Sequence, residues 1–321
     1  MWGDIGLGAL DAAGVTWEYL PRTVATFEPT DLAPYDAVIF AAPAVAASSF
    51  ADGVPRPALL ARFGVGYDTV DVAACTASGV GVTITPDGAM SPVATAALTM
   101  LLAVLHNLVV KDRLAREHRW DERVRWMGRG LTGSTVGLIG AGNTGSELVR
   151  LLQPFGVTVL AFDPFCPPER AAESGFSLVG VDELATRSDA VVVMAALTPE
   201  THHLVDAAFL AKMPTHAVLI NVARGPIVDE EALIAALEAG SIRAAGLDVF
   251  ENEPQASGVE RLDNVTLAPH SLAWTSEMSL GNGGSCVQAV LDVLSGRAPR
   301  FLLNPDVLGH SNVVARAGSL T

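Results

Sequence analysis

The stretch TVGLIGAGNTG, residues 135–145, decides the fold. It predicts a strand, a glycine turn and the start of a helix, and the apolar run VTVLAF, residues 157–162, predicts a second strand that ends at Asp163. A strand, a glycine turn, a helix and a second strand with an acid at its tip form the layout of a dinucleotide-binding unit. We therefore expect this stretch to bind a dinucleotide.

Each of the three glycines has its own expected role. Gly140 permits the tight turn, Gly142 lets the backbone approach a pyrophosphate, and Gly145 lets the helix lie close to the strand. The amides at the start of the helix then face the phosphates, where the helix dipole favours negative charge. Asp163 is placed to accept a hydrogen bond from a ribose 2′-hydroxyl and would repel a 2′-phosphate. We therefore expect the cofactor NAD rather than NADP.

The composition restricts the class of protein. A chain of 321 residues is long enough for about two domains. Its formal charge of −15 and its pI near 4.8 argue against a nucleic acid or an anionic membrane as partner. The three cysteines have no metal-ligand spacing, so we expect reduced thiols, no metal site and a cytoplasmic location. The apolar segment 94–110 is interrupted by polar residues, and we expect a buried helix there rather than a membrane span.

The first part of the chain predicts a small α/β domain. Residues 5–13 have helical spacing, and Gly14 is expected to end that helix. Short apolar runs at 15–20, 36–42 and 80–85 are strand candidates. Domains of this kind normally open on a strand, whereas this chain opens on a helix. We therefore expect that the first strand is missing through a truncated or misassigned start.

A long helix and an exposed arm are expected between the two domains. Ser91 and Pro92 resemble an N-cap followed by a proline at the first helical position, and the helix is expected to run toward His118 and bridge the domains. The stretch 113–129 is mostly polar, yet its apolar residues need a surface to pack on. These are Trp120, Val124, Trp126 and Met127. We expect this arm to pack on another subunit, which makes the protein a homodimer.

Four further apolar runs predict central parallel strands of the second domain. They are residues 189–194, 217–221, 242–248 and 265–268, and helices are expected at 230–239 and at about 274–294. In a parallel sheet of this kind the ligand lies beyond the carboxyl ends of the strands. Those ends carry Asp163, the loop with Thr198 and Pro199, Arg224, Glu253 and His270.

Three complementary polar groups follow successive strand ends. Arg224 carries a planar guanidinium, which matches a carboxylate in bidentate fashion. DVFENEP, residues 248–254, supplies Glu251 and Glu253, and His270 follows the next strand. A histidine can give or take a proton near neutral pH, and a neighbouring carboxylate fixes its tautomer. Each group alone could be structural, but three of them beside a dinucleotide site indicate catalysis.

These residues lie in motifs that resemble the D-isomer-specific 2-hydroxyacid dehydrogenase family, namely GLIGAGNTG, NVARGPIVDE, GLDVFENEP and APH, with FGVGYDTVD upstream. The resemblance implies an NAD-dependent oxidoreductase that transfers a hydride between NAD(H) and C2 of a small 2-hydroxy or 2-oxo acid. It also implies an α/β fold of two doubly wound parallel-sheet domains. A Rossmann NAD-binding domain, residues 96–289 with interdomain helices at both ends, would be inserted into a smaller flavodoxin-like substrate domain, residues 1–95 plus 290–321.

The same resemblance assigns roles to single residues. It implies that Arg224 holds the substrate carboxylate and that His270 is the general acid and base. Glu253 would be the partner of His270, and the backbone of Val65 and Gly66 would also contact the carboxylate. Trp274 departs from the family pattern, because many relatives have small residues after the histidine, and we expect it either to close one side of the substrate pocket or to pack in the first turn of the helix at about 274–294. The implied cofactor contacts are Gly140, Gly142, Asn143, Thr144, Gly145, Asp163, Thr198, Pro199, Val222, Ala223, Arg224, Asp248 and His270.

Two alternatives stay open at this point. One is a nucleotide-sensing scaffold, like the corepressors that resemble these dehydrogenases and keep the arginine, the glutamate and the histidine. The other is an inactive, N-terminally truncated relative, which the missing first strand and the glycines of the last helix would suggest. Thr95 is a departure, because many relatives carry a glutamate there. The pocket depends on loops, so the sequence leaves the identity of the 2-oxo acid open.

Overall fold

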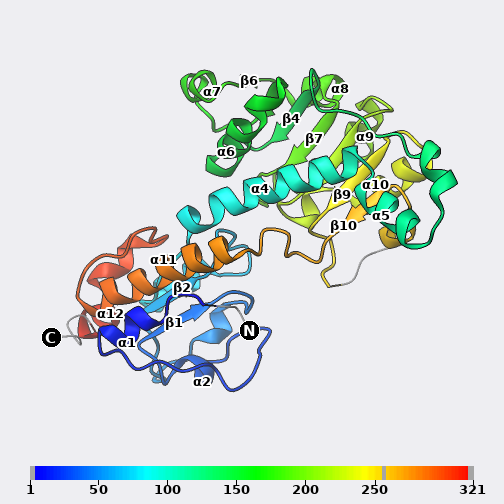
Figure 1. Ribbon diagram of the computed structural model, residues 1–321. Coiled ribbons are helices and arrows are strands. Elements are labelled where there is room, and N and C mark those ends of the chain that lie inside the picture. The colour runs from blue at the N-terminus through cyan, green and yellow to red at the C-terminus, as the bar shows by residue number, and fades with distance from the viewer. Residues whose placement is uncertain (1–3, 255–257, 317–321) are drawn as a thin grey trace. The chain divides into compact units, whose positions relative to one another are not determined.

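The computed structural model describes residues 4–254 and 258–316, and it divides into two compact units (Figure 1). The first unit comprises Met1–Ala89 and Trp274–Thr321, and the second comprises Met90–Ala273. The second unit is thus inserted into the first in the order of the chain. Its second boundary lies at residue 274 rather than at the expected 290, and the helix Ser276–Leu294 packs on the sheet of the first unit through residues 286–294.

A parallel sheet of seven strands forms the centre of the second unit, in the order β10-β9-β8-β7-β4-β5-β6. The order reverses between β4 and β7, and in open α/β sheets this switch point is where ligands bind. Every predicted strand of this unit is present, and only the two-residue β6 was too short to predict. The strands are β4 (Thr135–Ile139), β5 (Thr158–Phe162), β6 (Ser177–Leu178), β7 (Ala190–Val193), β8 (Val218–Asn221), β9 (Ala244–Leu247) and β10 (Val265–Leu267).

Helices cover both faces of this sheet because successive residues of each buried strand point to opposite sides. Leu138 packs with the cluster that includes α4 and α6, whereas the next residue, Ile139, packs with the cluster of α8, α9 and α10. The helices of this unit are α4 (Pro86–Leu105, which begins in the first unit), α5 (Leu108–Arg116), α6 (Asn143–Leu152), α7 (Pro168–Ser174), α8 (Val181–Arg187), α9 (Ala207–Lys212) and α10 (Glu230–Glu238). Short 3₁₀ turns are η2 (Trp120–Arg125), η3 (Gln153–Phe155), η4 (Gly225–Ile227) and η5 (Val259–Arg261).

Two predictions about α4 are wrong. The helix begins at Pro86, which takes the first helical position that proline favours, and Pro92 lies inside the helix. The helix also ends before the expected His118, because Asn107 has a left-handed backbone with φ of 53° and separates α4 from α5. The bridging role is confirmed, since α4 begins in the first unit and continues into the second.

By length and composition alone α4 could cross a membrane. Its inward residues, among them Ala97, Leu101 and Val104, are buried in the core of the second unit. The helix therefore packs as the core helix of a globular domain does, which agrees with the expected buried helix.

The first unit has a parallel sheet in the order β1-β2-β3, and both of its faces are covered. Leu59 and Ala61 of β2 face α1 and α11, whereas Leu60 packs on the opposite side with α2 and α3. The strands are β1 (Ala37–Phe40), β2 (Leu59–Arg62) and β3 (Gly81–Thr83). The helices are α1 (Gly8–Ala12), α2 (Pro29–Leu32), η1 (Ala47–Ser49), α3 (Val72–Ala77), α11 (Ser276–Leu294), η6 (Pro305–Gly309) and α12 (Ser311–Arg316).

The strand expected at residues 15–20 is not formed. Within residues 4–254 and 258–316, β1 pairs with β2 alone, and the segment 15–20 leaves the other edge of β1 unpaired. Gly14 does have the left-handed backbone, with φ of 73°, that was expected after the first helix.

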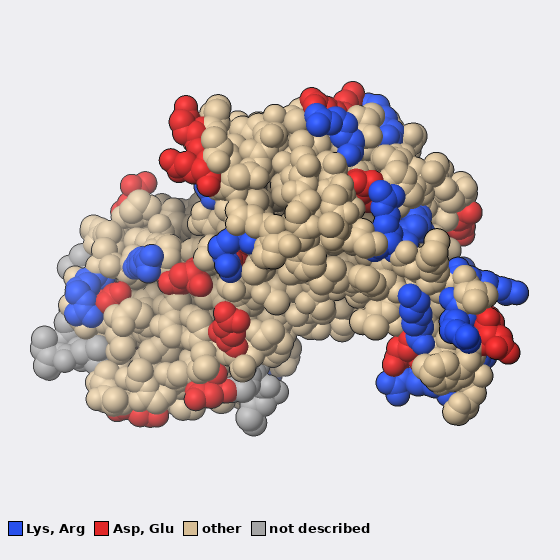
Figure 2. Space-filling view, turned by 45° about the horizontal axis from the view of Figure 1, so that its top comes forward, with Lys and Arg blue, Asp and Glu red and all other residues tan. Residues whose placement is uncertain are grey.

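Acidic and basic side chains are interspersed on a mostly uncharged surface on the face shown in Figure 2. The three cysteines are free, and burial raises the pKa of the Cys75 and Cys286 thiols to about 12. These two thiols are therefore protonated and unreactive at neutral pH.

Candidate active site

The glycine loop after β4 has the tight turn and the close helix–strand approach that its sequence predicts. Gly140 has φ of 90°, and a Cβ atom there would lie 2.7 Å from the backbone of Ala195. A Cβ atom on Gly145 would lie 2.8 Å from the carbonyl oxygen of Gly140, so only glycine lets α6 start this close to the strand. A Cβ atom on Gly142 would meet no atom within 4 Å. Gly142 therefore faces open space, as a backbone that a pyrophosphate approaches must.

Asp163 follows β5, and two backbone amides hold its carboxylate. Oδ2 accepts a hydrogen bond from the amide of Ala141 at 2.8 Å, and Oδ1 accepts one from the amide of Phe165 at 2.9 Å. The acid is thereby tied to the glycine loop across the ends of two neighbouring strands. Each oxygen keeps a lone pair with which it can accept a further bond, such as one from a ribose hydroxyl.

These features fit a dinucleotide. The open space at Gly142 lies directly before the first turn of α6, a ten-residue helix whose positive dipole end favours a phosphate. The other residues for which a cofactor contact is predicted follow the carboxyl ends of the strands: Asn143 and Thr144 in the first turn of α6, Thr198 and Pro199 after β7, and Val222 and Ala223 after β8.

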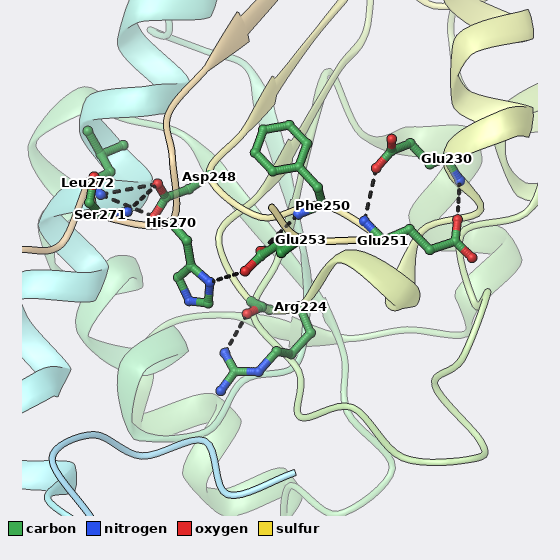
Figure 3. Close-up of polar contacts among 10 residues, drawn as sticks. Arg224, Glu230, Asp248, Phe250, Glu251, Glu253, His270, Ser271 and Leu272 are labelled. Carbon is green, nitrogen blue, oxygen red and sulfur yellow. Dashed lines mark hydrogen bonds and ion pairs between the residues drawn. The ribbon is translucent and has the colours of Figure 1, made fainter. Parts of the chain in front are cut away.

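Arg224 follows β8 in a loop that packs against the loop after β9. A Cβ atom on Gly225 would lie 1.9 Å from the carbonyl carbon and oxygen of Phe250, so this approach requires glycine. The buried amide group of Asn221 donates to the carbonyl of Arg224 at 2.9 Å and fixes the turn. The half-buried guanidinium donates to the carbonyl of Ala223 at 2.7 Å, and Figure 3 shows it on the same side of the loops as Glu253 and His270.

His270 and Glu253 form the hydrogen-bonded pair that was predicted (Figure 3). His270 Nδ1 lies 2.8 Å from Glu253 Oε2, and the other carboxylate oxygen accepts from the amide of Phe250 at 3.1 Å. An ionised carboxylate can only accept, so Nδ1 is the donor and Nε2 is the ring nitrogen left for a substrate.

The environment of Glu253 favours its ionised form. Burial by itself raises the pKa of this carboxyl, but the hydrogen bonds from His270 and Phe250 and the charges of His270 and Arg224 outweigh it. The pKa of Glu253 therefore lies below its ordinary value of 4.5. The carboxylate is ionised over the whole range in which a histidine titrates.

Asp248 holds the segment that carries His270. Its buried carboxylate accepts hydrogen bonds from the amides of Ser271 at 2.9 Å and Leu272 at 3.1 Å, and its carbonyl accepts from the amide of His270 at 2.7 Å. His270 has a left-handed backbone with φ of 50°, which is unfavourable for a residue other than glycine and needs such support. Burial raises the pKa of Asp248. The cofactor contact expected of Asp248 stays a prediction, and its role as an anchor was not predicted.

The loop after β2 in the first unit carries Val65 and Gly66. Arg62 Nε donates to the carbonyl of Gly66 at 3.1 Å, and the amide of Gly64 donates to Thr85 Oγ1 at 2.8 Å. These bonds fix the loop, and Val65 remains 40% exposed. The predicted contact of this loop with a substrate carboxylate stays a prediction.

Trp274 precedes α11 rather than lying in its first turn. The N-cap of that helix is Thr275, so Trp274 lies one residue before it, and both expected roles of its side chain stay predictions. Its ring packs against Phe63 with a centroid distance of 6.4 Å and remains 46% exposed. An exposed aromatic ring beside the start of the Gly64–Gly66 loop keeps the substrate-pocket interpretation open to test.

His202 and His203 come together with Glu251 in a way that their spacing does not predict. His203 has φ of 51°, which turns its ring to stack on that of His202 at 4.1 Å, and His203 Nε2 lies 2.7 Å from Glu251 Oε1. Glu251 also binds the backbone of Glu230 (Figure 3). Glu251 is thus engaged by another histidine, which separates its role from that of Glu253.

Residues 98–271 match the model of the D-isomer specific 2-hydroxyacid dehydrogenase, NAD binding domain. A glyoxylate reductase of Thermococcus onnurineus is 37% identical over 80% of this chain and 79% of its own length. A D-3-phosphoglycerate dehydrogenase of Mycobacterium tuberculosis is 40% identical over 75% of this chain but only 46% of its own length, so this chain spans about half of that enzyme.

A solved structure agrees with these matches. The NADPH-dependent glyoxylate/hydroxypyruvate reductase of Sinorhizobium meliloti, in complex with NADP and malonate, is 32% identical with a TM-score of 0.75 and covers 85% of this chain and 84% of its own. The matched family model covers the glycine loop, Arg224, Glu253 and His270, and the fold is a Rossmann sheet with the expected switch point. The chain therefore belongs to the family of D-isomer specific 2-hydroxyacid dehydrogenases, with an NAD-binding domain.

Proposed function

We propose that this protein reduces a small 2-oxo acid with NADH, or oxidises the corresponding D-2-hydroxy acid with NAD. The observation that carries the proposal is the His270–Glu253 pair with Arg224 beside it, at the carboxyl end of the switch-point sheet. A proton donor, its orienting carboxylate and a cation for an anionic substrate are the groups that this reaction needs.

The substrate carboxylate would bind to Arg224, because a guanidinium offers two parallel donors to two carboxylate oxygens. The backbone of Val65 and Gly66 would give further contacts to the same carboxylate. Trp274, whose ring packs against Phe63, would contact the substituent of the substrate. Family membership alone leaves the substituent open, since the relatives include a glyoxylate reductase and a phosphoglycerate dehydrogenase.

The bound dinucleotide would exchange a hydride with C2 of the substrate. Its phosphates would lie at Gly142 and the first turn of α6, and Asp163 would accept a hydrogen bond from the adenosine ribose. The Asp163 carboxylate, which two backbone amides hold in place, supports NAD over NADP. Its negative charge would repel the 2′-phosphate of NADPH.

His270 would move the proton. In the reductive direction Nε2 donates a proton to the carbonyl oxygen, and in the oxidative direction Nε2 takes it from the hydroxyl. Glu253 keeps Nδ1 protonated throughout and stabilises the imidazolium while the substrate is bound. Asp248 would keep the imidazole in place through the backbone that it anchors.

A screen of NADH oxidation tests this function, with glyoxylate, pyruvate, hydroxypyruvate, phenylpyruvate and branched 2-oxo acids as substrates. We expect turnover of at least one of them and a preference for NADH over NADPH. His270→Ala should lower kcat by about 10²-fold or more and leave NADH binding intact. Equal turnover by the variant would remove His270 from the mechanism. NADH binding without turnover of any of these acids would favour the corepressor-like scaffold or the inactive relative.

A further inference from the structure

Arg170 lies against the first turn of the helix that follows the glycine loop. Arg170 belongs to α7, and its Nη2 donates to Asn143 Oδ1 at 3.0 Å and to Ser146 Oγ at 3.4 Å. Asn143 is the first residue of α6 and directly follows Gly142. The guanidinium is therefore held next to the backbone that faces the predicted pyrophosphate.

The charge of Arg170 is unfavourable where it stands in the protein alone. The amino end of a helix carries a partial positive charge, so a cation there is repelled and an anion is attracted. In the described part of the chain Arg170 makes no ion pair, and its two hydrogen bonds are to neutral oxygens. The nearby Asp163 carboxylate is engaged by the amides of Ala141 and Phe165.

The chain nevertheless holds this cation in place instead of leaving it in solvent. The residue is half-buried, and two side chains of α6 accept from it. The guanidinium of Arg170 and the amino end of α6 are both positive. Their proximity is explained if an anion binds beside them, because the anion interacts favourably with the guanidinium and with the helix end. In a Rossmann domain the anion at this end of the helix is a phosphate of the dinucleotide.

We propose that Arg170 binds a phosphate group of the cofactor and completes the anion site that the glycine loop and α6 begin. The proposal rests on the NAD-binding character of this domain and not on the identity of the 2-oxo acid. The phosphate could be the pyrophosphate, which NADH and NADPH share, or the 2′-phosphate of NADPH alone. Arg170 is a cofactor-binding residue that the motif reading did not predict, because it lies 27 residues from Asn143 in the chain.

The test is a fluorescence titration of NADH and of NADPH, without substrate, against the wild type and Arg170→Ala. We expect the variant to bind NADH about tenfold more weakly, which corresponds to about 1.4 kcal/mol. An equal loss for both cofactors assigns Arg170 to the pyrophosphate, and a loss confined to NADPH assigns it to the 2′-phosphate. Arg170→Lys should recover part of the affinity, because it keeps the charge without the planar fork.

Arg150→Ala is the matched control. Arg150 is in the last turn of α6 and pairs with Glu147, so its removal changes the net charge equally but leaves the amino end of the helix untouched. It should bind NADH as the wild type does. An equal loss of affinity in this control would show a general charge effect and overturn the proposal.

Thermal melts separate cofactor binding from a structural role for Arg170. Because the cation is repelled by the helix end, Arg170→Ala should keep or raise the Tm of the free protein while reducing the upward shift that NADH causes. Unchanged affinity of Arg170→Ala for both NADH and NADPH, or a lowered Tm of the free protein with normal shifts by both cofactors, would show that Arg170 only joins α7 to α6. None of these measurements needs a turning-over substrate, so the result stands even if every 2-oxo acid tested is inert.

Discussion

His270 has two neighbours with different tasks. Glu253 acts on its ring, through the bond to Nδ1, and Asp248 acts on its backbone, through the bonds to residues 270–272. The ring bond decides which nitrogen faces a substrate, and the backbone bonds hold a left-handed residue in place. Removal of the Glu253 carboxylate should therefore have a different consequence from removal of the Asp248 carboxylate.

Glu253→Gln should lower kcat by about 10²-fold while NADH binding is kept. The amide is close in size but carries no negative charge to stabilise an imidazolium, and its NH₂ group can also present the wrong partner to Nδ1. Steady-state kinetics with the substrate found in the screen measure the change. Asp248→Asn is the comparison: it should lower the Tm as well, because it weakens the bonds to Ser271 and Leu272. A kcat for Glu253→Gln equal to that of the wild type would contradict the assigned role.

The stability difference between the wild type and Glu253→Gln should also depend on pH. The folded pKa of Glu253 lies below its ordinary 4.5, so its charge contributes stability above about pH 4.5, and that contribution is lost as the pH falls through the folded value. Urea unfolding at pH 7 and near pH 3 measures the difference. It should be largest at pH 7, and a larger difference at the acidic pH would refute the depressed pKa.

Two glycines of the loop are needed for folding, and the third is expected to be needed for cofactor binding. Gly140 and Gly145 are required by the protein itself, because a Cβ atom at either would collide with backbone. Gly142 is not required in this way, since its surroundings are open and its backbone has φ of −62°, which other residues adopt. The open position leaves room for the pyrophosphate that we predict there.

Gly142→Ala and Gly145→Ala should consequently impair different properties, namely NADH binding in the first variant and stability in the second. The first should keep the Tm of the free protein and weaken NADH binding by at least tenfold, or about 1.4 kcal/mol, because its methyl group enters the space of the phosphate. The second should lower the Tm itself, since α6 must move away from Gly140. Melting curves with and without NADH distinguish the two, and normal NADH binding by Gly142→Ala would show that the phosphate lies elsewhere.

The arm between α5 and β4 presents apolar side chains to solvent. Trp120 is 61% exposed, Val124 77% and Met127 85%. Large apolar groups clustered in one segment of a chain commonly mark an interface. The homodimer predicted from the sequence stays a prediction, and this arm is its expected contact.

Light scattering after gel filtration should give a mass of about twice 33.4 kDa for the wild type. The double variant Val124→Asp and Met127→Asp should give the monomer mass, because two charges cannot be buried at an apolar contact without partners. Tyr19→Asp is the control, since Tyr19 is 63% exposed but lies outside the arm. A wild type that elutes as a monomer, or a dimer that survives both substitutions in the arm, would contradict this assignment.

The sequence determined the features that depend on short stretches. Glycines with distinct steric tasks, apolar runs of strand length and polar residues just after them are local properties, and they predicted the seven-stranded unit except for β6. The same local properties wrongly predicted a helix start at Pro92 and a strand at residues 15–20. Local sequence does not decide which of two prolines, Pro86 or Pro92, begins a helix. It also does not decide whether an apolar run finds a neighbouring strand to pair with.

Local pattern did not decide which side chains act on each other: the family resemblance pointed to the pair of Glu253 and His270, and the tertiary structure decided the other contacts. Glu251 and Glu253 are equivalent by local pattern, but His203 engages the first and His270 the second, from 48 and 17 residues away. The contact of Gly225 with Phe250 brings Arg224 beside that pair, and the packing of α7 on α6 brings Arg170 to the glycine loop. Partner choice depends on strand order and on distances of a few ångströms between loops, and hydrogen bonds lose their strength beyond that range.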